Sequence, residues 1–247
     1  MHPKIKWKGK ERDMLEFAKT PPKGWNSWDV YGASVTEEEV KRNADIMAEK
    51  LKKYGWNYVV VDIQWYEPGA ESAAYRKFAD LKIDEYSRVL PAENRFPSSA
   101  DGVGFAPLAE YVHQLGLKFG IHILRGIPRQ AVHGRMHIKG TDKTADQIAI
   151  NSICPWNSDM YGVDMSIPEG QLYYDSLMEL YASWGVDFIK LMISHIQRFT
   201  EIHIERKLKG FERLSTKRDG TLYFPFRRDR QDCRMEVFFK KLQICGD

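Results

Sequence analysis

The segment Tyr58-Val59-Val60-Val61-Asp62 decides the fold, because it is a short apolar run that stops at a carboxylate. Such a run is typical of a parallel strand that is buried on both faces. A helical pattern precedes it over residues 36–54, with Thr36 and Glu39 at the predicted N-terminal cap and Gly55 at the end. The region therefore predicts one helix–strand step of an α/β fold.

The same alternation extends in both directions from this strand. Further strands are predicted at residues 24–28, 118–124 and 186–190, and further helices at residues 107–115 and 171–184. Such alternation favours a parallel sheet with right-handed crossovers. Long loops, including residues 125–168, follow the carboxyl ends of the strands, where barrel enzymes build their active sites. No glycine-rich phosphate loop follows the first strand, so a nucleotide-binding open sheet is disfavoured.

The composition limits the class of protein. The chain has 247 residues and a net charge of +3, which is too small to indicate a polyanionic partner. Its three cysteines, Cys154, Cys233 and Cys245, show no metal-ligand spacing and are an odd number for a disulfide framework. The sequence shows no secretory signal and no apolar run near the roughly 18 residues of a membrane span. These features predict a soluble, cytoplasmic protein without a metal, nucleic-acid or membrane partner.

The character of the sequence changes after Lys190. Residues 191–247 contain no alanine, asparagine or tryptophan. Their 13 basic and 8 acidic residues contrast with 24 basic and 26 acidic residues in the part before them. The alternation of strands and helices also stops there. We therefore treat residues 191–247 as a tail that differs from the preceding domain.

Five motifs lie in one order along the chain. They are Pro21-Pro22-Lys23-Gly24-Trp25-Asn26-Ser27-Trp28-Asp29, Val59-Val60-Val61-Asp62-Ile63-Gln64-Trp65-Tyr66-Glu67-Pro68, Leu108-Ala109-Glu110-Tyr111-Val112-His113, Gly116-Leu117-Lys118-Phe119-Gly120-Ile121-His122 and Trp184-Gly185-Val186-Asp187-Phe188-Ile189-Lys190. In order and spacing they closely resemble glycoside hydrolase family 27, the α-galactosidases, over residues 17–190. The resemblance implies hydrolysis of terminal α-galactosides with retention and without a cofactor.

The resemblance also implies an α/β fold and divides the chain into three parts. Residues 1–16 are an N-terminal extension, and residues 17–190 are the N-terminal half of a TIM (β/α)₈ barrel with about four strands. Residues 191–247 are a tail unlike the family. A half barrel leaves two unpaired sheet edges and an exposed apolar sheet face, so we expect poor solubility or a molten character.

The sugar-binding residues of the family can be carried over one by one. A sugar ring needs an aromatic wall for its apolar face and carboxylates for its hydroxyls. The resemblance implies that Trp28 is the wall, that Asp62 binds hydroxyls and that Lys190 binds the sugar at the end of the fourth strand. Asp29 and Trp65, which belong to the same motifs, complete the expected substrate-binding set.

Two positions depart from the family. Ile63 stands where many relatives have a second aspartate, so one contact to the sugar is altered and selectivity for galactose is weakened. Met192 stands where the family has its nucleophilic aspartate, and a thioether cannot form the glycosyl-enzyme. The chain also stops before the segment in which the family keeps its acid/base aspartate. We therefore expect no intact catalytic residue and no hydrolysis by this chain.

A shifted reading frame would explain the tail. Lys190-Leu191-Met192-Ile193 can be encoded as AAA TTG ATG ATA, and one added A gives Lys-Ile-Asp-Asp, with an aspartate at position 192. In that frame residues 210–229 permit Ile-Arg-Lys-Ala-Ile-Asp-Lys-Thr-Gly-Arg-Asp-Ile-Val-Leu-Ser-Leu-Ser-Pro-Gly, and residues 241–247 permit Ala-Ala-Asn-Met-Trp-Arg. Both resemble the family. Our hypothesis is a one-base deletion near codon 190.

Other interpretations compete with these. The tail could be a genuine diverged segment whose basic stretch, residues 206–230, suits single-stranded nucleic acid, although acidic residues interrupt it. His133 and His137 are predicted to be loop residues, because no further metal ligand is evident near them. Cys154 and Trp156 are expected to shape the rim of the pocket. The chain could also be a carbohydrate-binding relic, or derive from an enzyme for β-L-arabinopyranosides or α-N-acetylgalactosaminides.

Overall fold

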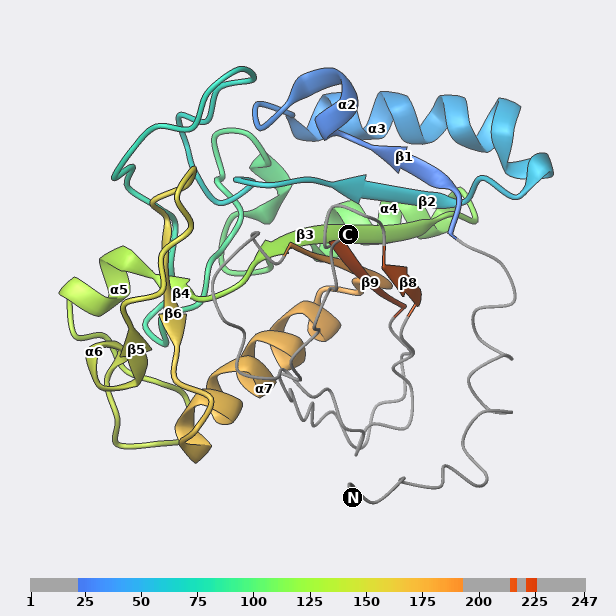
Figure 1. The fold of residues 1–247 in the computed structure, drawn as a ribbon. Helices are drawn as coiled ribbons and strands as arrows, with labels where there is room; N and C mark the ends of the chain where they lie inside the picture. The colour runs from blue at the N-terminus through green and yellow to red at the C-terminus, as the bar shows by residue number, and fades with distance from the viewer. Residues whose placement is uncertain (1–21, 193–213, 217–220, 226–247) are drawn as a thin grey trace, which may run out of the picture.

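The computed structural model describes residues 22–192, 214–216 and 221–225 (Figure 1). The N-terminal extension, residues 1–16, lies outside the described residues, and so does most of the tail. The predictions made for those parts therefore stay predictions. The described residues contain residues 22–190 of the segment 17–190 for which the sequence predicts a barrel.

The main sheet has six strands in the order β1–β2–β3–β7–β9–β8 (Figure 1). Four are mutually parallel, namely β1 (Gly24–Asn26), β2 (Tyr58–Val61), β3 (Lys118–Leu124) and β7 (Phe188–Met192). These four lie side by side in the order in which they occur along the chain. A doubly wound sheet would reverse its strand order at a switch point. The topology is therefore that of a partial barrel wall, as the sequence predicts.

Each connection between neighbouring parallel strands contains one helix of nine or more residues. These helices are α3 (Glu37–Ile46), α4 (Ala106–Gln114) and α7 (Pro168–Ser183). They share one apolar core with alternate strand residues such as Val59, Ile121 and Ile189. The strand residues between them, including His122 and Lys190, therefore belong to the opposite face, which would be the inside of a closed barrel.

The helix that begins after Thr36 confirms the predicted cap. The Thr36 hydroxyl accepts a hydrogen bond from the Glu39 N–H at 3.5 Å, and the Thr36 N–H donates to the Glu39 carboxylate at 2.8 Å. The regular helix ends at Ile46, earlier than predicted, and continues as a π turn over Met47–Leu51 and a 3-10 turn over Lys52–Tyr54. Gly55 then stops it with a φ of 83°, a backbone conformation that favours glycine.

Other element boundaries differ from the prediction by a few residues. The strand predicted at residues 24–28 ends at Asn26, because the Asn26 side chain accepts a hydrogen bond from the Trp28 N–H at 3.2 Å and the short helix α2 (Trp28–Tyr31) begins. The strand β3 has its predicted bounds. Helix α7 begins earlier than predicted, at Pro168, a residue suited to a first helical turn.

The excursion at residues 125–168 contains structure that the sequence did not indicate. A three-stranded antiparallel sheet forms in the order β4 (Ile127–Pro128), β6 (Met160–Val163) and β5 (Ala149–Ile150). Two short helices, α5 (Arg129–His133) and α6 (Ala145–Ile148), join these strands. Elements of two to five residues are too short to produce a periodic pattern.

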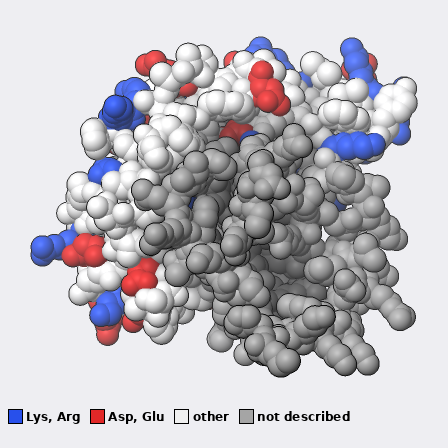
Figure 2. Space-filling view, in the orientation of Figure 1, with Lys and Arg blue, Asp and Glu red and all other residues white. Residues whose placement is uncertain are grey.

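The surface of the described residues carries mixed charge. Figure 2 shows basic and acidic side chains interspersed around the rim of one face. That pattern offers no patch of one sign on the described part of this face for a polyanion. Among the described residues, no helix combines the length and the apolar character needed to cross a membrane.

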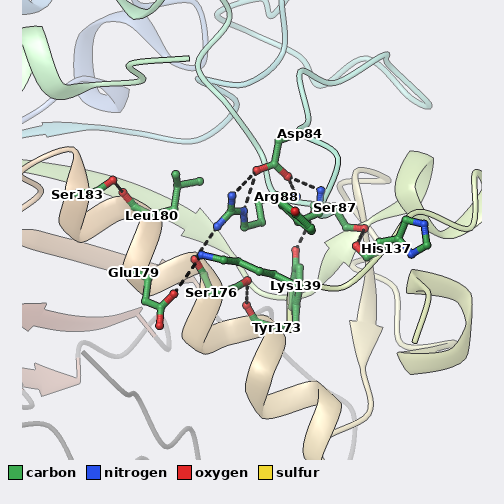
Figure 3. A network of polar contacts seen from close by, with 11 residues as sticks. Asp84, Ser87, Arg88, His137, Lys139, Tyr173, Ser176, Glu179, Leu180 and Ser183 are labelled. Atoms are coloured by element: carbon green, nitrogen blue, oxygen red, sulfur yellow. Dashed lines mark hydrogen bonds and ion pairs between the residues drawn. The ribbon is translucent and has the colours of Figure 1, made fainter. Parts of the chain in front are cut away.

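Polar contacts fasten the long loop after β2 to helix α7 (Figure 3). The Arg88 guanidinium donates to the Asp84 carboxylate at 2.8 Å and to the Ser176 carbonyl at 3.2 Å. The Tyr173 hydroxyl donates to the Ser87 carbonyl at 3.1 Å. Since these residues are buried or nearly so, the loop has a fixed backbone beside the carboxyl edge of the sheet.

The fourth parallel strand is not an edge of the sheet, because two further strands extend the sheet beyond it. Strand β7 pairs antiparallel with β9 (Thr221–Pro225), which pairs with β8 (Leu214–Thr216). The unpaired N–H and C=O groups of an edge strand can form hydrogen bonds with a further extended segment. Among the described strands, this sheet ends at β1 and β8, each of which pairs on one side only, so its second edge is β8 in place of β7. The predicted poor solubility stays a prediction.

Candidate sugar-binding site

Asp62 and Lys190 meet at the carboxyl edge of the parallel strands. The Lys190 ammonium donates to the Asp62 carboxylate, with Nζ and Oδ2 2.7 Å apart. Asp62 directly follows β2, and Lys190 lies in β7, so β3 separates the two strands in the sheet. The structure therefore brings together two residues that the sequence predicts to bind one sugar.

Backbone contacts hold the Asp62 carboxylate in place. The Asp62 N–H donates to the hydroxyl of the buried Ser27 at 2.9 Å, which ties the end of β2 to the loop after β1. The Ile63 N–H donates to the other carboxylate oxygen of Asp62 at 2.7 Å. Both oxygens thus have a partner, and the carboxylate has a fixed orientation.

The electrostatics favour an ionised Asp62. Burial raises the pKa of this carboxyl, but the neighbouring His122 and Lys190, together with the Lys190 hydrogen bond, lower it by more. The net pKa of Asp62 therefore lies below its ordinary value. Asp62 is a carboxylate at neutral pH and can accept hydrogen bonds from sugar hydroxyls.

His122 lies between these two residues and was not predicted as part of the site. It pairs with Lys190 in the register of β3 and β7 and is fully buried. Burial lowers the pKa of His122 to about 4, against the opposing charge of Asp62, so the imidazole is neutral at pH 7. Neither ring nitrogen has a hydrogen-bond partner within the described structure. A histidine in the otherwise apolar run of β3 was the only sequence signal.

Three aromatic side chains line the rim near this ion pair. Trp28 stacks on Tyr75, with ring centroids 5.8 Å apart and planes 21° apart. Tyr75 also contacts Trp156, at 5.3 Å between centroids. Trp28 and Trp156 are both about two-fifths exposed, at 40% and 41%. The structure therefore places Trp28 and Trp156 on one aromatic rim, and adds Tyr75, which the sequence did not single out.

The other two predicted substrate-binding residues lie elsewhere. Trp65 is fully buried in the core, where its ring packs against Phe105 and Trp184, and its indole N–H donates to the His122 carbonyl at 2.7 Å. Trp65 is therefore a core residue whose indole hydrogen-bonds to the backbone of β3. Asp29 is exposed in α2, and no contact within the described ranges links it to Asp62.

Position 192 lies at the carboxyl end of β7, two residues beyond Lys190 and opposite Leu124 in the register. This is where the resemblance expects the nucleophilic aspartate, and the residue is methionine. Ile63, the other position that departs from the family, is fully buried and has no polar side-chain atom. The chain therefore has no carboxylate at the position where the resemblance expects the nucleophile.

Metal binding finds no support in the described part of the chain, where no group of three or more histidine, cysteine or acidic residues is placed to hold an ion. His133 ends helix α5, so the prediction that it is a loop residue is wrong, and its ring contacts the Tyr161 hydroxyl at 3.1 Å. His137 is an exposed residue between helices α5 and α6. Cys154 is a buried free thiol.

A parallel barrel wall that presents a lysine–aspartate pair beneath aromatic side chains defines the class of a barrel glycoside hydrolase. A Geobacillus stearothermophilus β-L-arabinopyranosidase of family 27, solved with arabinose, is 66% identical over 72% of this chain and 42% of its own, with a TM-score of 0.71. A Bacillus halodurans structure described as a candidate α-N-acetylgalactosaminidase is 62% identical over the same shares, with a TM-score of 0.68. The α-galactosidase A of Cellvibrio japonicus is 28% identical over 71% of this chain and 30% of its own length.

Over the 72% of its length that these structures match, the chain belongs to glycoside hydrolase family 27. No family model matches the sequence. The chain spans less than half the length of the relatives it matches. The resemblance found in the motifs is thereby confirmed.

Proposed function

We propose that this chain carries the sugar-binding part of a retaining hydrolase for terminal β-L-arabinopyranosides. The observation that supports this best is the 66% identity to a β-L-arabinopyranosidase, compared with 28% to an α-galactosidase. The sequence analysis placed α-galactosides first and arabinopyranosides among the alternatives. The comparisons favour those alternatives, and α-N-acetylgalactosaminides remain the second candidate because of the 62% identity to the Bacillus halodurans protein.

The chemistry of position 63 supports the same choice. β-L-Arabinopyranose has the ring hydroxyl pattern of α-D-galactopyranose but lacks the hydroxymethyl group. A second aspartate at position 63 could accept a hydrogen bond from an additional hydroxyl, whereas the buried Ile63 side chain cannot. An apolar residue beside Asp62 therefore suits a sugar that has a hydrogen atom in place of the hydroxymethyl group.

The binding role of the remaining residues follows from their types. Asp62 supplies acceptors and Lys190 supplies donors for ring hydroxyls, and they are already oriented by their contact at 2.7 Å. Trp28 offers a partly exposed indole for the apolar face of the ring. Because these groups are held before a ligand arrives, little ordering is needed on binding.

The reaction itself requires two carboxyl groups. One attacks the anomeric carbon as the glycosidic bond breaks, and the other protonates the departing oxygen and later activates water. Methionine at position 192 can supply neither a nucleophile of this kind nor a negative charge. We propose that the chain binds the sugar without cleaving it, and that restoration of the reading frame at codon 190 returns the nucleophile.

The test combines binding and turnover. Isothermal titration of the 247-residue chain with L-arabinose, D-galactose and N-acetyl-D-galactosamine should give the tightest binding for L-arabinose. Asp62→Asn should weaken that binding, while Asp142→Asn, a change at an exposed loop carboxylate, should leave it unaltered. The frame-restored protein should hydrolyse nitrophenyl β-L-arabinopyranoside faster than the α-galactoside. Preference for galactose or for the acetylated sugar in both assays would reject the proposal.

A further inference from the structure

A second carboxylate, Asp159, lies near the site and has half of its hydrogen-bonding capacity unused. Three donors converge on its Oδ2 atom: the Gln64 amide at 3.0 Å, the Asn157 amide at 3.0 Å and the Tyr66 hydroxyl at 3.2 Å. Its Oδ1 atom is buried and has no partner within the described ranges. The Oε1 atom of Gln64 is buried and equally without a partner there.

This arrangement costs free energy unless something else donates to it. A buried acceptor without a partner loses its hydration without compensation. Asp159 is 3% exposed and Gln64 is 0% exposed, so bulk water does not replace the missing donors. Oδ1 of Asp159 and Oε1 of Gln64, which have no partner within the described ranges, each need a hydrogen-bond donor. A sugar hydroxyl or an ordered water molecule has the necessary O–H group.

The backbone of Gln64 is also held in an unfavourable conformation. Its φ is 62°, in the left-handed region that residues other than glycine rarely adopt. The buried Arg95 fixes it there by donating to the Gln64 carbonyl at 2.7 Å. Such strain persists where the surroundings enforce it, and it often marks a functional position.

The pair lies beside the ion pair that is expected to bind the sugar. Gln64 follows Asp62 by two residues, and Asp159 comes from the excursion at residues 125–168. Tyr75 contacts Trp156, three residues before Asp159, with ring centroids 5.3 Å apart. Burial and the charges of Asp62 and Asp159 raise the pKa of Tyr75. Tyr75 also stacks on Trp28. The bare acceptors and the aromatic rim therefore border one site.

We infer that Asp159, positioned by Gln64, binds a ring hydroxyl of the pyranose and is a second carboxylate of the site, contributed by the excursion at residues 125–168. Asp159 is then a specificity-determining residue, which accepts through Oδ1 from the sugar. Gln64 acts through Asp159 and accepts a further donor through Oε1. The inference rests on the proposed function, because it assumes that the ligand of this site is a sugar.

The test measures binding of L-arabinose to the 247-residue chain by isothermal titration. Asp159→Asn should raise the dissociation constant by about 10- to 100-fold, the usual effect of a hydrogen bond to a charged group. Its thermal unfolding temperature should not fall, because the new amide can donate to the Gln64 oxygen that has no partner. Asp142→Asn, at an exposed position of the same excursion, is the matched control and should keep the wild-type dissociation constant.

A second measurement has a wild-type arm that does not depend on the stability of the variant. Methyl β-L-arabinopyranoside is compared with its monodeoxy derivatives on the wild-type chain and on Asp159→Asn. One derivative should bind the wild type as weakly as the parent sugar binds the variant, and the variant should not discriminate the two. Equal affinity of wild type and Asp159→Asn for the parent sugar would assign the bare oxygens to a bound water and overturn the inference alone. No binding of any of these sugars to the wild type would overturn the proposed function and the inference with it.

Discussion

Replacement of Lys190 by methionine is the perturbation whose size the structure fixes most clearly. Nζ of Lys190 lies 2.7 Å from Oδ2 of Asp62, and the two side chains are only 11% and 2% exposed. Lys190→Met therefore leaves a buried carboxylate without its cation. Removing one partner of a buried pair costs about 3–5 kcal/mol, a large share of the 5–15 kcal/mol that holds a typical domain folded.

The double variant Asp62→Asn/Lys190→Met separates the pair from its parts. Asparagine keeps an acceptor for the Ile63 N–H but carries no charge, so the double variant should be more stable than Lys190→Met alone, with a coupling of about 2 kcal/mol. Urea unfolding at pH 7, followed by tryptophan fluorescence, gives the free energies of unfolding. Lys143→Met, at an exposed lysine, is the control and should cost about 0.5 kcal/mol or less. Coupling near zero would refute the reasoning, because the two side chains would then act independently.

Three further predictions use other parts of the molecule. The pKa of His122 is about 4 in the folded chain, below its reference value of 6.5. As the pH falls from 6.5 to 4, the unfolded chain therefore binds a proton at His122 before the folded chain does, and the free energy of unfolding should decrease. This decrease in the free energy of unfolding should be about 3 kcal/mol smaller in His122→Phe. If the urea midpoint depended on pH in the same way in both proteins, the prediction would be contradicted. Thr36→Ala removes the cap of α3 and should lower the free energy of unfolding by about 1 kcal/mol, whereas an unchanged urea midpoint would show that the cap contributes nothing. Sequencing the DNA across codons 190–192 should show a missing base, and an intact frame with no shifted open frame would reject the deletion.

Much of the fold could be predicted because its strands are buried on both faces. The apolar run of β3 and the Thr36–Glu39 cap carry their information locally, so their positions were predicted correctly. The sheet of β4, β5 and β6 could not be predicted, since its strands are two to four residues long and are defined by pairing across the excursion. The pairing of β9 with β7 depends on contacts between distant segments and likewise leaves no periodic signal.

The proximity of Asp62 and Lys190 could be predicted because these motif residues lie at the ends of parallel strands. Asp62 and Lys190 are 128 residues apart, and the parallel register brings them into contact. The role proposed for Asp159 could not be inferred from the sequence, because it depends on donors from Gln64 and Tyr66, which lie more than 90 residues away. Trp65 was predicted to bind substrate but lies in the core. The sequence alone does not distinguish these two places for an aromatic residue next to a strand end.

Release of nitrophenol from nitrophenyl β-L-arabinopyranoside, measured side by side with the purified 247-residue chain and with the frame-restored protein, tests the absence of a nucleophile most directly. The account predicts that the chain with methionine at position 192 gives only the background rate while still binding L-arabinose, and that the restored protein turns over. Sustained turnover by the 247-residue chain would contradict it, since an unassigned group would then have to attack the anomeric carbon.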